Sequence, residues 1–250
     1  MNRDQGMTLE YARDLAETLV ELLRPACQRI EIAGSVRRGK PTPNDVEIVA
    51  VPRWRGQVTL MWGVEPTENM LDLRCLELLA TGQLEKRPDS QGRYCWGTGV
   101  KRAVFFQGKD YAPVDLFQVI APVQWGVIYA IRTGPGDVNH RLVTSRALGG
   151  ACPLDRKVAG GRVWDLTAYT MIERVNVTRM AATKFIQLVG RSIPGVPMIP
   201  TPEEEDFFAA LGVPCWPPEQ RTVHRLVQLS DKAGDCQPWP LLAHTESPGS

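Results

Sequence analysis

The chain has 250 residues, of which 43% are hydrophobic and 23% charged, and its 29 basic and 28 acidic residues leave a net charge of +1. This balance excludes a protein that coats nucleic acid through its overall charge, so any nucleic-acid binding needs a local basic patch. The length suffices for one large domain or two small ones, each with a hydrophobic core.

The sequence predicts a soluble, intracellular protein. Its first residues, MNRDQGMTLEYARDLAETL, lack the apolar core of a signal peptide, and no run approaches the roughly 20 apolar residues of a membrane span. The six cysteines form no Cys-x-x-Cys pair, which argues against zinc and favours free core thiols. We therefore expect a monomer without membrane contact in the cytoplasm, either of its own cell or of the host of a virus.

The first elements are a helix and two strands. Leucines at helical spacing predict a helix over residues 8–24, with Thr8 as its N-cap and Pro25 as its stop. Alternating and apolar runs predict strands over residues 29–34 and 45–51.

A second helix and a β-hairpin follow. The helix is predicted over residues 67–84, with Thr67 as its cap and Gly82 at its end. Two apolar runs, residues 100–107 and 114–120, predict the strands of the hairpin.

The second half of the chain shows weaker patterns. We expect helices over residues 123–134 and 137–150, the first ending before a glycine, and a short acidic-capped helix within 201–213. Residues 168–190 are apolar without a clear period, and no structure is assigned to them. The order of elements predicts a mixed-sheet α/β domain (α+β), residues 1–150, then a smaller subdomain, 151–235, and a loosely ordered tail, 236–250.

Two carboxylates stand at the start of the second strand, in the stretch EIAGSVRRGKPTPNDVEIVAV. Asp45 and Glu47 are two residues apart, so on a strand both point to one face while Val46 and Ile48 point to the other. Like charges this close repel unless a cation lies between them, and carboxylate oxygens suit Mg²⁺. The alternative is a solvated strand face, which is common for a single pair of this kind.

A phosphate-binding pattern precedes the carboxylates. Gly34 and Ser35 end a strand and enter a turn, where backbone N–H groups and a hydroxyl can hold phosphate oxygens. Arg37 and Arg38 follow at once, and guanidinium groups bind phosphate in bidentate fashion. The two features together predict a triphosphate held beside the metal ions that activate it.

A third acid is expected if two metal ions are to bind both the attacking and the leaving oxygen. Asp115 is the only acid in a strand that otherwise reads as core, so it should be paired or bound to metal. A water-exposed Asp at a strand edge is the alternative.

These segments resemble the palm of the family X DNA polymerases, the DNA polymerase beta family of nucleotidyltransferases. The matching segments are GSVRRG, NDVEIV and VDLFQV, then WGVIYAIRTGPGDVNHRLVTSRAL and the thumb-like TPEEEDFFAALGVPCWPPEQR. The resemblance implies a palm with a thumb alone, because too few residues precede the Gly-Ser turn for the lyase domain and fingers of larger members. It also implies a cis Gly134–Pro135 bond.

The resemblance implies roles for individual residues. Asp45, Glu47 and Asp115 would bind two Mg²⁺ ions, or Mn²⁺ in their place, with Asp115 closest to the primer 3′-hydroxyl. The incoming deoxynucleoside triphosphate would contact Gly34, Ser35, Arg38, Tyr129 and Gly134. Phosphates of the DNA primer-template could contact Lys40, Lys101, Arg102 and Arg141, although such surface charges often bind nothing specific.

The leading hypothesis is template-directed DNA synthesis by two-metal phosphoryl transfer. A net charge of only +1 predicts weak, salt-sensitive DNA binding, and hence low-processivity gap filling in DNA repair. One alternative is a small nucleotidyltransferase that moves a nucleotide to a protein, an RNA end or a small molecule. Another is a non-catalytic module that binds DNA ends.

Overall fold

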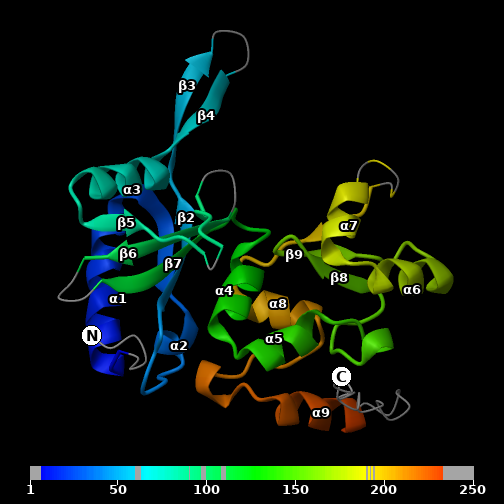
Figure 1. Ribbon diagram of the computed structural model, residues 1–250. Helices are drawn as coiled ribbons and strands as arrows, with labels where there is room; N and C mark the ends of the chain where they lie inside the picture. Colours follow the sequence, from blue (N-terminus) through cyan, green and yellow to red (C-terminus); the bar gives the residue numbers. More distant parts are fainter. Residues whose placement is uncertain are drawn as a thin grey trace, which may run out of the picture.

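The computed structural model describes residues 7–59, 63–89, 91–96, 100–107, 111–189, 191, 193 and 195–232. It confirms the predicted fold class: a mixed α/β architecture built on a mixed five-stranded sheet, with further helices and short strands in the C-terminal part (Figure 1). None of the described helices is long and apolar enough to cross a lipid bilayer.

The five-stranded sheet has the order β1-β2-β7-β6-β5. Its central pair, β2 and β7, is parallel, and the other neighbouring strands are antiparallel. The predicted strands and the predicted hairpin are confirmed as four of its members, whereas β5 was not expected. The strands are β1 (Cys27–Ile32), β2 (Val46–Pro52), β5 (Leu84–Lys86), β6 (Lys101–Phe106) and β7 (Ala112–Gln118).

Two helices cover one face of this sheet, α1 (Leu9–Leu23) and α3 (Met70–Ala80). The side chain of Thr8 caps α1 as predicted, and the chain then passes through a 3₁₀ turn (Arg24–Ala26). The predicted cap of α3 is wrong. Asn69 accepts hydrogen bonds from the first backbone N–H groups of the helix, whereas Thr67 belongs to the preceding strand.

Strand alternation divides β2 between two environments. Val46, Ile48 and Ala50 are fully buried in the core beneath α1 and α3. Val49 lies on the opposite face, in a separate cluster under α4 (Trp125–Thr133). Residue 47 shares that second face, near the start of β2.

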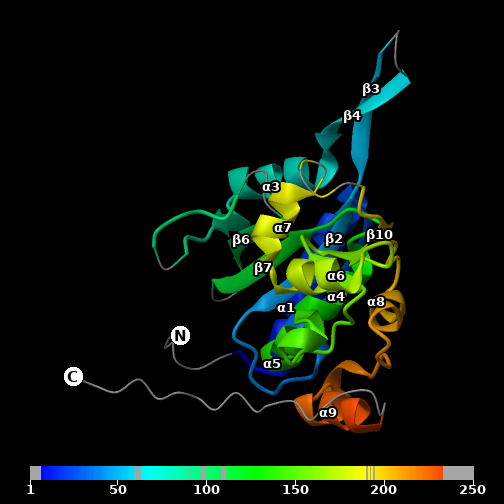
Figure 2. The same cartoon turned by 90° about the vertical axis from the view of Figure 1, so that its right-hand side faces the viewer.

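A two-stranded ribbon, β3 (Trp54–Thr59) and β4 (Gly63–Asn69), projects from the end of the sheet (Figures 1 and 2). It was not predicted, because its sequence has no clear alternation of apolar and polar residues. At its base Arg55 forms an ion pair of 2.6 Å with Glu68.

The C-terminal part packs helices against a small three-stranded sheet of order β10-β9-β8. The unassigned residues 168–190 form the two helices α6 and α7, and the predicted helix over 137–150 ends early, at Val143, before a 3₁₀ turn (Arg146–Leu148). The elements are α5 (Gly136–Val143), β8 (Arg156–Ala159), β9 (Arg162–Asp165), α6 (Met171–Arg179), α7 (Ala182–Leu188), β10 (Met198–Ile199), α8 (Glu204–Ala210), a 3₁₀ turn (Pro218–Gln220) and α9 (Val223–Lys232).

One hydrophobic cluster crosses the predicted boundary at residue 150. Val127 and Leu142, from α4 and α5, pack in it with Phe207, Phe208 and other C-terminal residues. Residues on both sides of position 150 thus share one hydrophobic core. The expected cis bond between residues 134 and 135 is also wrong, because the only cis bond in the described chain is Ala121–Pro122.

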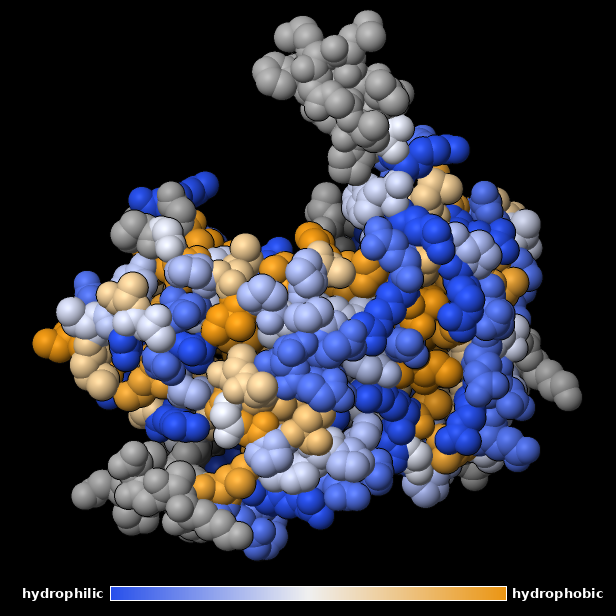
Figure 3. Space-filling model, turned by 180° about the vertical axis from the view of Figure 1, so that it is seen from behind, coloured by the Kyte–Doolittle hydropathy of each residue, from blue (hydrophilic) through white to orange (hydrophobic). Residues whose placement is uncertain are grey.

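The face of the molecule behind the view of Figure 1 is predominantly polar. Figure 3, which views the molecule from behind, shows hydrophilic residues over much of the described surface, with hydrophobic residues in groups between them. Among the large hydrophobic side chains that are more than one third exposed, Trp54, Val100 and Ile120 line a single cavity.

Two arginines of the N-terminal part join it to α8. Arg29 forms a bidentate ion pair with Glu203, at 2.8 Å for both contacts, and its guanidinium lies 4.0 Å from the ring centre of Trp125. Arg37 likewise binds Glu204, at 3.0 and 2.9 Å, and lies 4.0 Å from the ring centre of Tyr129.

Glu204 also accepts a hydrogen bond of 2.8 Å from Arg221. Both side chains of this pair are almost fully buried, at 1% exposure for Arg221 and 6% for Glu204. Burial by itself raises the pKa of Glu204, but hydrogen bonds from Arg221 and Arg37 outweigh it and lower the pKa below its usual value. The carboxylate thus stays charged and holds the two arginines together.

We expect Glu204→Ala to lower the free energy of unfolding by about 3–5 kcal/mol, because it leaves a buried guanidinium without its anion. Glu21→Ala, which breaks an exposed pair with Arg24, should change it by less than about 0.5 kcal/mol. Denaturant titration of the wild type and both variants measures the difference. Equal effects of the two substitutions would contradict a structural role for Glu204.

Candidate metal and nucleotide site

The three predicted acids lie together at one end of the central strand pair. Asp45 directly precedes β2, Glu47 is its second residue, and Asp115 lies in β7. Glu47 and Asp115 are register partners in the parallel ladder, so they share one face of the sheet on strands about 4.8 Å apart. That face is the one opposite to α1 and α3, and α4 packs on it through Trp125.

The acids perturb one another. Burial, followed by the charge of Asp45, raises the pKa of Glu47 to about 7. Burial and the charge of Asp115 raise the pKa of Asp45. A raised pKa here means that the negative charges are undercompensated, and a bound cation would relieve this.

Asp115 is already compensated by protein cations. It is 6% exposed and forms ion pairs with both Arg87, which follows β5, and Lys101 of β6. These two cations also lower the pKa of Asp45, so their charge reaches across the site.

The three carboxylates are of the type that binds a divalent cation, but their side chains do not converge on one point. Carboxylate oxygens are the preferred ligands of Mg²⁺. In the part of the chain that the structure describes, however, no group of three or more His, Cys, Asp or Glu side chains converges as metal ligands. For all three acids to bind an ion, Asp115 must exchange Arg87 and Lys101 for it.

Gly34 and Ser35 form a turn that packs closely beside Glu47. Gly34 has φ +65°, and a Cβ atom at this position would lie 2.4 Å from Oε2 of Glu47. Only glycine permits both the backbone conformation and this close approach. The Ser35 hydroxyl is buried and has no hydrogen-bond partner among the described residues, so it is available to a ligand.

Arg38 and Gly134 are in direct contact. The Arg38 guanidinium donates hydrogen bonds to the carbonyl oxygens of Thr133 and Gly134, the second at 3.3 Å, and its charge lowers the pKa of Glu47. The structure thus brings these two predicted nucleotide-binding residues together near the acids.

Tyr129 lies apart from the acids. Its hydroxyl donates to the carbonyl oxygen of Ile32, its ring stacks on Arg37, and burial raises its pKa to about 12. The contact of Arg37 with Glu204 likewise directs that guanidinium away from phosphate binding. Both residues therefore join α2 (Gly34–Arg37) to α4 and α8.

Of the four predicted DNA-binding residues, two lie near the acids. Lys101 pairs with Asp115, and the charge of exposed Lys40 lowers the pKa of Asp45. Arg102 is on the opposite face of β6, is 3% exposed and pairs with Asp72 of α3, so it does not contact the acids. Arg141 lies on α5 in the C-terminal part.

Two basic residues of the site were missed. Arg87 reaches Asp115 because β5 pairs with β6, and nothing in the sequence indicated that pairing. Arg132 lowers the pKa of Glu47 and stacks on Phe117, with its guanidinium 4.1 Å from the ring centre. Its place in the last turn of α4 brings it near the acids, which only the packing of α4 on the sheet reveals.

No protein-family model matches the chain, and a comparison with curated protein sequences finds no match. The function is therefore inferred from the residues and their geometry. The in-register acids, the unpartnered Ser35 hydroxyl and the surrounding cations bear on it.

Gly34→Ala tests the close approach of the turn to Glu47, and Gly39→Ala is its matched control. Gly39 also has a positive φ, +69°, but nothing lies within 4 Å of its added Cβ. Both variants incur the cost of a left-handed conformation, about 1–2 kcal/mol. Only Gly34→Ala displaces Glu47, so it should lose a further 1–3 kcal/mol or so in chemical denaturation. Equal losses in the free energy of unfolding would show that Glu47 can move away from the added methyl group without destabilising the fold.

The raised pKa of Glu47 predicts a pH dependence of stability. Between pH 4.5 and about 7 the folded chain keeps a proton that the unfolded chain releases, so the free energy of unfolding falls as pH rises through this window. Glu47→Gln should remove about 2 kcal/mol of that fall. Denaturant titrations at several pH values measure it, and parallel curves for wild type and variant would contradict the assignment.

Proposed function

We propose that the chain is a Mg²⁺-dependent, template-directed DNA polymerase that resembles family X and fills short gaps in DNA repair. The single observation that carries the proposal is the pair Glu47 and Asp115, in register on adjacent strands beside Asp45 and the Gly34–Ser35 turn. This arrangement suits phosphoryl transfer because it offers oxygen ligands for divalent ions next to a place for phosphate.

Asp45, Glu47 and Asp115 would hold the two metal ions, which lower the pKa of the primer 3′-hydroxyl and neutralise charge on the transferring phosphate. The two acids with raised pKa values, Asp45 and Glu47, belong to the segment that follows the Gly-Ser turn. Asp115 reaches them from β7 and would lie closest to the primer end.

The incoming deoxynucleotide would lie on the Gly34–Ser35 turn. The Ser35 hydroxyl, which lacks a partner in the described chain, would donate to a phosphate oxygen. Arg38 and Arg132, whose charges both reach Glu47, would neutralise the triphosphate. Gly134 would bring its backbone to the same pocket through its contact with Arg38.

Arg87 and Lys101 would bind a primer-strand phosphate. Both are held on Asp115, the acid that would lie closest to the 3′-hydroxyl. An ion that takes their place on this carboxylate would release two cations beside the primer end, where a phosphate can accept their hydrogen bonds.

Primer extension tests the proposal. The purified chain, with Mg²⁺ and each single deoxynucleoside triphosphate, is expected to extend gapped and recessed DNA only with the nucleotide that pairs with the template. Asp115→Asn and Asp45→Asn should reduce the rate by about 100-fold or more, because each removes a charge that stabilises the transition state. Asp14→Asn, on the exposed side of α1, should leave it unchanged.

Other outcomes separate the alternatives. Transfer of a nucleotide without regard to the template, or to a protein or RNA acceptor, would replace the polymerase with a small nucleotidyltransferase. Calorimetry that shows DNA-end binding but no Mg²⁺-dependent binding of a deoxynucleotide would favour a non-catalytic module. Circular dichroism of each variant confirms that it is folded.

A further inference from the structure

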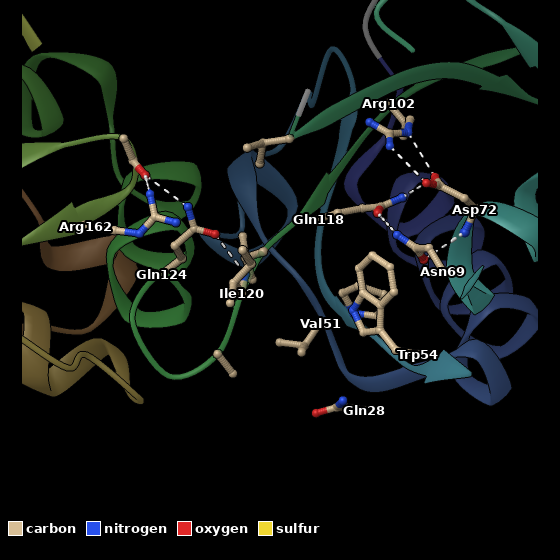
Figure 4. A pocket seen from close by; sticks show the side chains of 15 residues that line it. Gln28, Val51, Trp54, Asn69, Asp72, Arg102, Gln118, Ile120, Gln124 and Arg162 are labelled. Atoms are coloured by element: carbon tan, nitrogen blue, oxygen red, sulfur yellow. Dashed lines mark hydrogen bonds and ion pairs between the residues drawn. The ribbon is translucent and has the colours of Figure 1, made fainter. Parts of the chain in front are cut away.

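A cavity of about 790 Å³ lies at the opposite end of the central strands from the acids (Figure 4). Val51 and Pro52, the last residues of β2, line it, whereas Glu47 stands near the start of that strand. Its walls come from both halves of the molecule: the sheet and the base of the ribbon on one side, and residues around Gln124 and Arg162 on the other.

Its polar wall is a fixed hydrogen-bond network. Asn69 donates to Gln118 at 2.8 Å, Gln118 donates to Asp72 at 2.7 Å, and Arg102 binds both carboxylate oxygens of Asp72 at 3.1 Å. Asn69 is also fixed as the cap of α3. The wall therefore presents amide and charged edges in one rigid arrangement.

Apolar side chains surround this network. Trp54, at 52% exposure, Val100 and Ile120 are among the most exposed large hydrophobic residues of the described chain, and all three line the cavity. Trp54 is the register partner of Asn69 in the β3–β4 ribbon, which places the indole beside the polar wall. An exposed indole next to hydrogen-bonding groups suits a flat ligand with polar edges.

The cavity also carries an uncompensated positive charge. Its charged lining residues are Asp72, Arg102 and Arg162, and the first two neutralise each other. Arg162 donates to the carbonyl oxygen of Gly160 at 3.3 Å and forms no ion pair with any residue that the structure describes. A ligand that fills the cavity should therefore carry a negative charge.

Gln124 supports Arg162 from α4. Its side-chain amide donates to the same Gly160 carbonyl at 3.0 Å and accepts from the backbone of Ile120 at 2.9 Å. Gly160 and Gly161 both have positive φ, so the tight turn that presents Arg162 depends on them. The guanidinium is thus held across the cavity from Trp54 (Figure 4).

We propose that this cavity binds one unpaired nucleotide of a single-stranded nucleic acid. The base would stack on Trp54 and meet the amide edges of Asn69 and Gln118, and its phosphate would bind Arg162. Stacking on an aromatic ring and a phosphate contact to arginine are the two interactions that single-strand sites combine. The inference does not require the acids to be catalytic, because none of them lines the cavity.

The test is binding of a fluorescent single-stranded oligodeoxythymidylate, measured by anisotropy in EDTA so that the acid site holds no metal. Trp54→Ala should weaken binding at least about fivefold, the loss expected for one stacked base. Arg162→Gln should weaken it and lower the slope of log K against log salt by about 0.7, as for one lost phosphate contact on a single strand. Ile172→Ala and Arg24→Gln remove an exposed apolar side chain and an exposed charge outside the cavity, and should bind as the wild type does.

A second arm uses a mononucleotide, deoxyadenosine monophosphate, as competitor. If the mononucleotide displaces the oligonucleotide from the wild type, and Trp54→Ala weakens this displacement, the cavity binds a free nucleotide as well as a strand. Wild-type affinity in both cavity variants, or no oligonucleotide binding by the wild type, would overturn the inference. Trp54-dependent binding by a chain that fails in primer extension would support the cavity and reject the polymerase proposal alone.

Discussion

The mutual repulsion of three carboxylates governs the end of the sheet at which they meet. Asp45, Glu47 and Asp115 are forced together by the parallel pairing of β2 with β7, and burial there makes their charges more costly. Ion pairs from Arg87 and Lys101 to Asp115 offset part of this cost. Burial and then the charge of Asp45 raise the pKa of Glu47 to about 7, and the charges of Arg132 and Arg38 offset this rise only in part.

The arginine contacts around α8 determine which residues lie near these acids on the side of the Gly34–Ser35 turn. Arg37 follows directly from the Gly34–Ser35 turn and is held by Glu204 and the ring of Tyr129. Arg37 also donates to the hydroxyl of Thr133 at 2.8 Å, and Arg38 donates to the carbonyl oxygens of Thr133 and Gly134. The ion pair between Arg37 and Glu204, which joins the two halves of the molecule, thus lies next to the residue, Arg38, that contacts Gly134 in the proposed nucleotide site.

The acids and the cavity use the two ends of the same strand pair. At the start of β2 the face opposite to α1 and α3 carries Glu47, beside the Gly34–Ser35 turn. The last residues of β2 line a cavity, together with the base of the ribbon and the turn before Arg162. Helix α4 packs on the face between them through Trp125. The two proposed sites are therefore separate in chemistry but share one rigid support.

The sequence by itself determined the local features: the strand alternation that separates Glu47 from Val46 and Ile48, the cap at Thr8, and the need for glycine at position 34. These depend on neighbours in the chain, so their signals are contained in a few residues. The same alternation places adjacent residues of a strand on opposite faces, and thus only Lys101 of the pair 101–102 reaches the acids.

Only the tertiary structure decided which segments meet. The pairing of β5 with β6 carries Arg87 to Asp115, and the ribbon shifts the cap of α3 to Asn69. Helices α4 and α5 pack with the C-terminal helices in one hydrophobic cluster. Each outcome depends on contacts between residues far apart in the chain, whose free energy is shared by the whole core. Periodicity identifies the face of a strand, but it carries no information about the strand beside it.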